Sequence, residues 1–253
     1  MTGSRARPPR SGAGTAGTTG TARAAGAAGT AAGTAGTLRE TGERLAAEAA
    51  RFASFGWMRG TSGNVSAVIS AEPLQLAVTG SGIDKGSLTA DDIVVVDEAG
   101  QRVPPVAEAA GAEEAGQRVP AGPGEQPSAR PSAESALHAR VVRLTGAGAV
   151  VHVHTIAAVA AGRRWPDGIE LTGLEMLKGI GVAAAGETVT LPVVANSQDM
   201  AELGEELERS RDPRVPAAVV ADHGLYAWGR DLLQARHHTE IVQWLLEFMI
   251  ASG

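Results

Sequence analysis

Two histidines lie inside a long apolar run, and this pattern most restricts what the chain can form. The run reads GAVVHVHTIAAVAA over residues 148–161. Side chains two residues apart in a β-strand point to the same face, roughly 7 Å apart, so His152 and His154 can share one small cation. Burying two imidazoles without polar partners is unfavourable. The run therefore predicts a buried strand over residues 149–154 whose histidines share a ligand, with two separately satisfied core histidines as the alternative.

A third imidazole follows another apolar, strand-like segment. His223 comes directly after residues 217–221 and one aspartate, and Gly224 allows the backbone to turn beside it. The chain has no cysteine, so no thiolate can take part in a metal site. Three neutral nitrogen donors with an open position are typical of a catalytic zinc or a related divalent metal. His152, His154 and His223 are therefore the candidate ligands.

Composition excludes several functional classes. The 253 residues are 43% hydrophobic, with a formal net charge of −6 at pH 7. This is enough apolar material for one sizeable domain. The absence of a long basic run argues against a nucleic-acid or membrane partner. No apolar run has transmembrane length, and neither cysteines nor a signal-like apolar region are present, so we expect a cytoplasmic protein.

Two stretches of low complexity flank or interrupt this domain. Residues 1–36 consist almost wholly of Gly, Ala, Thr and Ser with several arginines, which predicts a disordered tail. Residues 104–130 form a second such stretch, in which EAGQRVP at 114–120 repeats 98–104. We expect this duplicated insertion to have no chemical role. Residues 37–253 are the expected catalytic domain.

Between these stretches, helical and strand patterns alternate. The expected helices are residues 38–59, 132–144, 174–180, 198–209 and 231–250, with Ser132 as an N-cap. The expected strands are residues 64–69, 74–78, 93–96, 149–154, 217–221 and 225–228. Short strands that follow one another early, with helices later, predict an α/β fold with a mixed, largely antiparallel sheet flanked by helices.

Two glycine-rich turns are candidates for holding an anion. They read GTSGNVS at residues 60–66 and TGSGIDKG at 79–86. Both combine hydroxyls with glycines, which let backbone N–H groups approach a phosphate closely. Ser132 adds a hydroxyl near a helix start, where negative charge is favoured. Each turn alone is also compatible with an ordinary hairpin.

In chain order, these turns and PSAE (131–134), HVH (152–154) and HGL (223–225) resemble the class II aldolase family. The resemblance extends from about residue 38 to the C-terminus. It implies a three-layer α/β/α sandwich, a homotetramer with active sites between subunits, and one divalent metal per subunit, Zn²⁺ first among the candidates. The segments LEMLKG (174–179) and LYAWGRD (225–231) look like the branch that dehydrates 5-methylthioribulose 1-phosphate to 2,3-diketo-5-methylthiopentyl-1-phosphate in methionine salvage.

The resemblance also implies a role for individual residues. It assigns the metal to His152, His154 and His223. It assigns the substrate phosphate to Ser62, Gly63, Asn64, Gly80, Ser81, Ser132 and, unless its side chain is solvated, Lys85. Glu134 matches the acid/base of the aldolases, and Glu175 matches that of the dehydratase branch.

Each glutamate also has a plain interpretation. Glu134 would be an ordinary first-turn residue favoured by the helix dipole, and Glu175 an exposed partner of Lys178 at i+3. Asp222 departs from the branch, which often has a basic or small residue there. A sugar-phosphate aldolase or epimerase is the alternative function, followed by a non-catalytic aldolase-like interaction module.

Overall fold

The computed structural model describes residues 38–105 and 129–253. The predicted tail and most of the duplicated insertion lie outside these residues. A seven-stranded sheet forms the centre, in the order β3-β2-β1-β4-β9-β8-β7. All neighbouring strands are antiparallel except β7 and β8, which are parallel. The predicted mixed, largely antiparallel sheet is thus confirmed.

The strands of this sheet are short. They are β1 (Asn64–Ala71), β2 (Leu74–Thr79), β3 (Ile93–Val96), β4 (Ala149–Val153), β7 (Val193–Val194), β8 (Ala217–Val220) and β9 (Gly224–Gly229). A separate antiparallel hairpin pairs β5 (Ile169–Thr172) with β6 (Thr188–Leu191).

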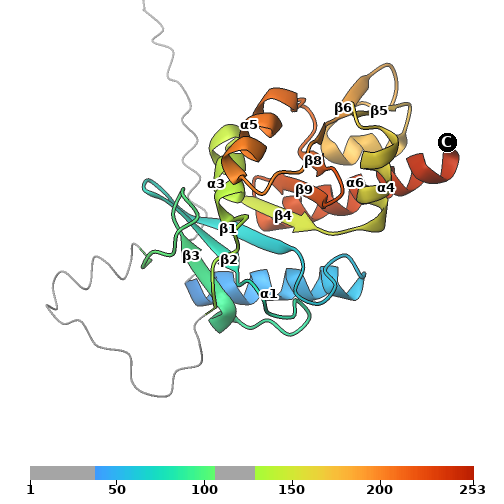
Figure 1. The fold of residues 1–253 in the computed structure, drawn as a ribbon. Helices are drawn as coiled ribbons and strands as arrows, with labels where there is room; N and C mark the ends of the chain where they lie inside the picture. The colour runs from blue at the N-terminus through green and yellow to red at the C-terminus, as the bar shows by residue number, and fades with distance from the viewer. Residues whose placement is uncertain (1–37, 106–128) are drawn as a thin grey trace, which may run out of the picture. The chain divides into compact units, whose positions relative to one another are not determined.

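Helices cover both faces of the sheet, which gives three layers (Figure 1). One face packs on α1 (Leu38–Ser54), α4 (Ile156–Arg164), α6 (Leu232–Ser252) and the 3₁₀ helix η2 (Glu175–Ile180). The other face packs on α3 (Ser135–Thr145) and α5 (Met200–Ser210). A short 3₁₀ turn, η1 (Ala90–Asp92), precedes β3. In the described parts of the chain, no helix has the length and apolar character needed to cross a membrane.

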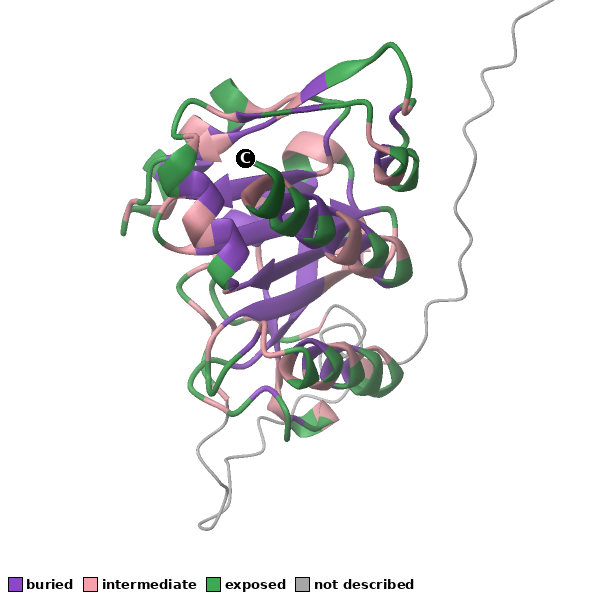
Figure 2. Ribbon diagram, turned by 90° about the vertical axis from the view of Figure 1, so that its right-hand side faces the viewer, coloured by how far each residue is buried: buried purple, intermediate pink, exposed green. Residues whose placement is uncertain are grey.

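Strand β4 occupies the middle of the sheet and is buried on both sides (Figure 2). Ala149, Val151 and Val153 belong to the core beneath α1, α4 and α6. Val150 belongs to the core beneath α3 and α5, and His152 lies on that same face because strand side chains alternate. The apolar run therefore forms the predicted buried strand, because a central strand covered by helices needs apolar residues on both faces.

Some predicted boundaries are wrong for identifiable reasons. Helix α1 ends at Ser54 and not at residue 59, because Gly56 adopts a left-handed conformation with φ of 74°. Ser132 is not the N-cap of α3. The helix begins at Ser135 with Glu134 at the N-cap, so Glu134 precedes the helix and is not a residue of its first turn.

Several elements were not predicted at all. Residues 156–164 form α4, although they read as a continuation of the apolar strand. The hydroxyl of Thr155, which accepts a hydrogen bond from the backbone N–H of Ala158, caps this helix. Strands β5, β6 and β7 were also missed. β7 has only two residues and gives no periodic signal. β5 alternates buried and exposed side chains, which is the signal that could have revealed it.

Candidate active site

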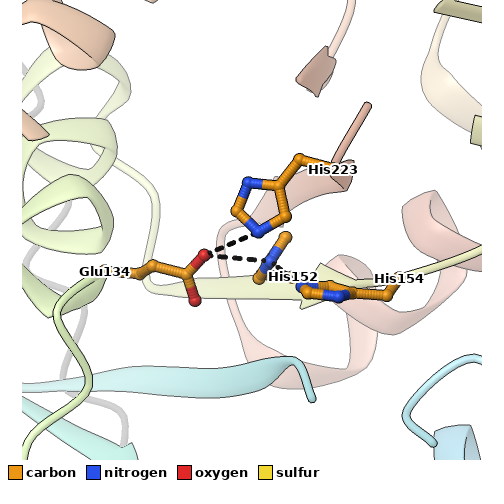
Figure 3. Close-up of side chains that lie close together, drawn as sticks. All are labelled: Glu134, His152, His154 and His223. Carbon is orange, nitrogen blue, oxygen red and sulfur yellow. Dashed lines mark hydrogen bonds and ion pairs between the residues drawn. The ribbon is translucent and has the colours of Figure 1, made fainter. Parts of the chain in front are cut away.

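Four side chains meet at the end of β4, on the face covered by α3. The potential ligand atoms of Glu134, His152, His154 and His223 all lie within 4.8 Å of one another (Figure 3). Nε2 of His152 is 2.8 Å from Nε2 of His154. Oε1 of Glu134 is 3.2 Å from Nε2 of His152 and 3.1 Å from Nε2 of His223. The structure thus brings the three predicted ligands together and adds a carboxylate to them.

Different elements place these groups. His152 is within β4, His154 follows its last residue, and His223 lies in the turn between β8 and β9. Asp222, the residue that departs from the family pattern, has a left-handed backbone with φ of 56°, which aspartate tolerates better than most residues. Its carboxylate accepts from Nε of Arg163 on α4. Asp222 therefore holds the turn that presents His223.

The orientation of His152 is fixed by the backbone of the neighbouring strand. Its Nδ1 is 3.2 Å from the carbonyl oxygen of Leu225. Because a carbonyl can only accept, Nδ1 carries the proton in this contact. The lone pair of Nε2 then faces the other imidazoles, as is usual for histidine ligands of metals.

Burial controls the charges in this group. Burial and the neighbouring imidazoles of His152 and His223 lower the pKa of His154 to about 4. Burial opposes ionisation of Glu134, but its contacts with His152 and His223 outweigh this and hold its pKa below the usual range. Imidazole nitrogens beside an ionised carboxylate are a donor set that divalent metals use, so the residues fit such a cation.

A small cavity of about 140 Å³ adjoins the cluster. Both glycine-rich turns line it, together with Glu134 and His154. All seven residues predicted to hold phosphate are in its wall: Ser62, Gly63, Asn64, Gly80, Ser81, Lys85 and Ser132. Gly63 has a φ of 75°, and a Cβ there would lie 2.8 Å from the carbonyl oxygen of His152, so the first turn requires glycine at its closest approach to β4.

Lys85 lies in the cavity wall and contacts both glycine-rich turns. Its side chain is only 1% exposed, so it is not a solvated lysine. Nζ donates to the carbonyl oxygens of Thr61, Gly80 and Ile83 at 3.0–3.1 Å. Burial lowers its pKa, and Asp84 and Glu134 partly offset this. The ammonium group therefore ties the two glycine-rich turns together and contributes positive charge beneath the cavity.

Glu175 does not join the cluster. It lies at the start of η2 with its side chain 74% exposed, and its carboxylate accepts from Nζ of Lys178 at 2.7 Å. This is the plain i, i+3 pair that the sequence offered as the alternative.

Tyr226 belongs to this site but was not predicted from the sequence. Its hydroxyl donates to Oε1 of Glu134 at 3.0 Å, and it is completely buried. A signal was present, because a lone tyrosine within an apolar strand usually needs a partner for its hydroxyl. His138 was also missed. It is buried on α3, its Nδ1 contacts the hydroxyl of Ser66 at 2.7 Å, and burial lowers its pKa to about 3.

Comparison with known proteins identifies the family of this chain. The sequence profile described as Class II Aldolase and Adducin N-terminal domain matches residues 43–250. The chain belongs to the class II aldolase family. Among curated members, the methylthioribulose-1-phosphate dehydratase of Persephonella marina is 32% identical, over 77% of this chain and 81% of that protein. The enzyme of the same name from Sulfurihydrogenibium sp. is 34% identical with the same coverage.

The fold of the family is found in solved structures as well. The sugar-phosphate aldolase of Thermotoga maritima superposes with a TM-score of 0.58 at 17% identity, covering 85% of this chain and 96% of that one. At this identity the likeness shows a shared fold, which is the three-layer sandwich of the class II aldolase family expected from the sequence.

Proposed function

We propose that this class II aldolase family member is a cytoplasmic methylthioribulose-1-phosphate dehydratase of methionine salvage. It would convert 5-methylthioribulose 1-phosphate to 2,3-diketo-5-methylthiopentyl-1-phosphate, with residues 37–253 as the catalytic domain. The observation that carries the proposal is the meeting of three imidazoles and Glu134 beside a cavity lined by both glycine-rich turns. The two dehydratases named above, at 32–34% identity, favour this substrate over other phosphorylated ketoses.

We propose that His152, His154 and His223 hold one divalent metal, with Zn²⁺ the best match for three neutral nitrogen donors. When bound, this cation supplies Lewis-acid stabilisation of negative charge on the ketose oxygens. The chain itself supplies the positioning. Ser62, Gly63, Asn64, Gly80, Ser81 and Ser132 would hold the phosphate, with Lys85 beneath them. A phosphate fixed there places the other end of the sugar at the histidine cluster.

The reaction removes a proton from C3 and hydroxide from C4, and the resulting enol tautomerises to the diketone. We propose that Glu175 takes the C3 proton and returns one to the departing hydroxyl. Glu175 is exposed and is not among the clustered side chains, so we propose that it acts at the active site of a neighbouring subunit. We therefore propose a homotetramer with active sites between subunits. Glu134, held among the histidines, would shape the metal's surroundings.

Direct assay of the product tests the proposed reaction. Purified protein loaded with zinc is incubated with 5-methylthioribulose 1-phosphate, and the diketone is followed by mass spectrometry. We expect a product lighter than the substrate by one water. Carbon–carbon cleavage or a stereoisomer of unchanged mass would instead identify the sugar-phosphate aldolase or epimerase. The position of Glu134 beside the histidines keeps that second function open, since Glu134 matches the acid/base of the aldolases.

Mixing of two inactive variants tests whether Glu175 acts across subunits. His154→Ala lacks a metal ligand, and Glu175→Gln lacks the acid/base, so each homo-oligomer should be inactive. After mild dissociation and reassembly together, some sites combine intact histidines with an intact Glu175 from the neighbour. We expect activity to return in the mixture. Activity that never rises above the sum of the two variants would contradict an action across subunits.

A further inference from the structure

Tyr226 lies in a row of polar side chains that crosses three adjacent strands. The register pairs Asn64 of β1 with His152 of β4, and His152 with Tyr226 of β9. These residues are buried, with Asn64 3% exposed and the other two 0%. All three contact Glu134, which comes from the start of α3. The sheet therefore presents a preassembled surface to this carboxylate.

The row holds both oxygens of the carboxylate. Oη of Tyr226 donates to Oε1 at 3.0 Å, and Nδ2 of Asn64 donates to Oε2 at 2.6 Å. Oε1 is also the oxygen that faces Nε2 of His152 and of His223. Tyr226 thus contacts the oxygen of Glu134 that points toward the candidate ligands.

The ring of Tyr226 is as constrained as its hydroxyl. It stacks on the imidazole of His152 with centroids 4.0 Å apart and planes inclined by 14°, and it meets His138 edge-on at 5.8 Å. Burial, together with the charge of Glu134, raises the pKa of the phenol well above its ordinary value. The phenol therefore remains a hydrogen-bond donor, and its ring has little freedom to turn away.

We propose that Tyr226 is a positioning residue that fixes the carboxylate of Glu134 and the imidazole of His152 at the metal centre. It acts on Glu134 through its hydroxyl and on His152 through the stacked ring. This inference rests on the proposed metal centre, and the experiment below separates the two. Removing a residue that orients a metal ligand without touching the metal typically changes metal affinity or activity by roughly 10- to 100-fold.

Tyr226→Phe removes the hydroxyl and keeps the stacked ring. We expect the apparent Kd for zinc, measured by competition with a chromophoric chelator, to rise roughly tenfold. Thr239→Val is the matched control, because it removes a buried hydroxyl that donates to Ala235 within α6 and contacts no member of the cluster. Its Kd should equal that of the unmodified protein. An unchanged Kd in Tyr226→Phe would overturn the inference, whereas an unmodified protein that binds no zinc would overturn the metal centre itself.

A double-mutant cycle shows whether the hydroxyl acts through Glu134. In the Glu134→Gln background, Tyr226→Phe should weaken zinc binding less than twofold further, because the carboxylate that it positions is already gone. If Tyr226→Phe acted only by loosening the core, it would raise the Kd for zinc by the same factor in the unmodified protein and in Glu134→Gln. That result would overturn the proposal.

A second measurement does not depend on the folding of Tyr226→Phe. Tyr226 is the only tyrosine of the chain, so growth on 3-fluorotyrosine labels this ring alone. We expect its single ¹⁹F resonance to shift when zinc is added and again in Glu134→Gln. A resonance that is the same in all three samples would contradict the coupling.

Discussion

Glu134 and Glu175 both lie at the start of a helical segment, Glu134 as the N-cap of α3 and Glu175 as the first residue of η2, yet their surroundings are opposite. The Glu134 side chain is 16% exposed and contacts two histidines, an asparagine and a tyrosine. The Glu175 side chain is 74% exposed and pairs with Lys178. Glu134 contacts residues that are far from it along the chain, from Asn64 to Tyr226. The partner of Glu175 is only three positions away in the sequence.

These surroundings indicate what each glutamate can do within one subunit. Glu134 is held as an anion beside the histidines and has no freedom to reach a distant proton. Glu175 is exposed and is not among the four clustered side chains of its own subunit. An acid/base needs access to its proton, and a residue beside a metal needs a fixed position. The predictions below test this division, beginning with the largest effect.

Loss of a histidine should have the largest effect. His152→Ala removes the buried candidate ligand of β4, so zinc content should fall to background. Several kcal/mol of transition-state stabilisation would be lost, which corresponds to roughly 10³-fold or more in turnover. Metal analysis and steady-state kinetics measure both. Full activity after exhaustive treatment with a chelator would show that the cluster is not a metal centre.

Glu175→Gln should lower turnover by roughly 10²- to 10⁴-fold, the usual range for a lost general acid/base. Zinc content and thermal stability should be unchanged, because the side chain is exposed. Glu170→Gln is the control, since Glu170 is an exposed glutamate on the neighbouring β5. Its turnover should match that of the unmodified protein.

Glu134→Gln should show the reverse pattern, with altered zinc affinity and a smaller effect on dehydration. If Glu134→Gln were inactive and Glu175→Gln nearly fully active, the roles would be those of an aldolase. The dehydratase mechanism would then have to be abandoned.

The buried region should also make the metal-free protein sensitive to acid. Burial lowers the pKa of His154 to about 4 and that of His138 to about 3, whereas an unfolded histidine has a pKa near 6.5. Below about pH 6.5 the unfolded chain therefore binds more protons, and the free energy of unfolding falls as the pH decreases toward 4. The fully buried His138 contributes about 1.4 kcal/mol per pH unit.

Urea unfolding of chelator-treated protein between pH 7.5 and 5 measures this slope. His138→Gln keeps a polar group for Ser66 but cannot titrate, so its slope should be flatter. An identical slope in the variant would show that His138 does not cause the acid sensitivity.

The smallest effect is expected at the exposed pair. Lys178→Met removes an ion pair whose side chains are 64% and 74% exposed, and such pairs contribute about 0–1 kcal/mol. The free energy of unfolding should change by less than about 0.5 kcal/mol. A loss of several kcal/mol in urea unfolding would show that η2 depends on this pair and that Glu175 is less free than its exposure indicates.

Much of the fold could be predicted because its signals are local. The apolar run that forms β4 and the amphipathic pattern of α5 are visible in a few neighbouring residues. The glycine-rich turn at residues 60–66 was also predicted from its residues, as a candidate for holding an anion, whereas the cavity that it lines is known only from the structure. Helix α4 was missed because an alanine-rich segment after a buried strand has no distinct period, and its Thr155 cap is a single-residue signal.

The sequence alone predicts that His152 and His154 share a face, because side-chain alternation along a strand is a property of the backbone. It also placed His223 at the end of another strand. The tertiary structure was needed to show that Asn64, Glu134 and Tyr226 surround these histidines and that Glu175 does not. Those contacts depend on the strand order β1-β4-β9-β8 and on the packing of α3 over it, which join residues far apart in the chain and leave no local pattern.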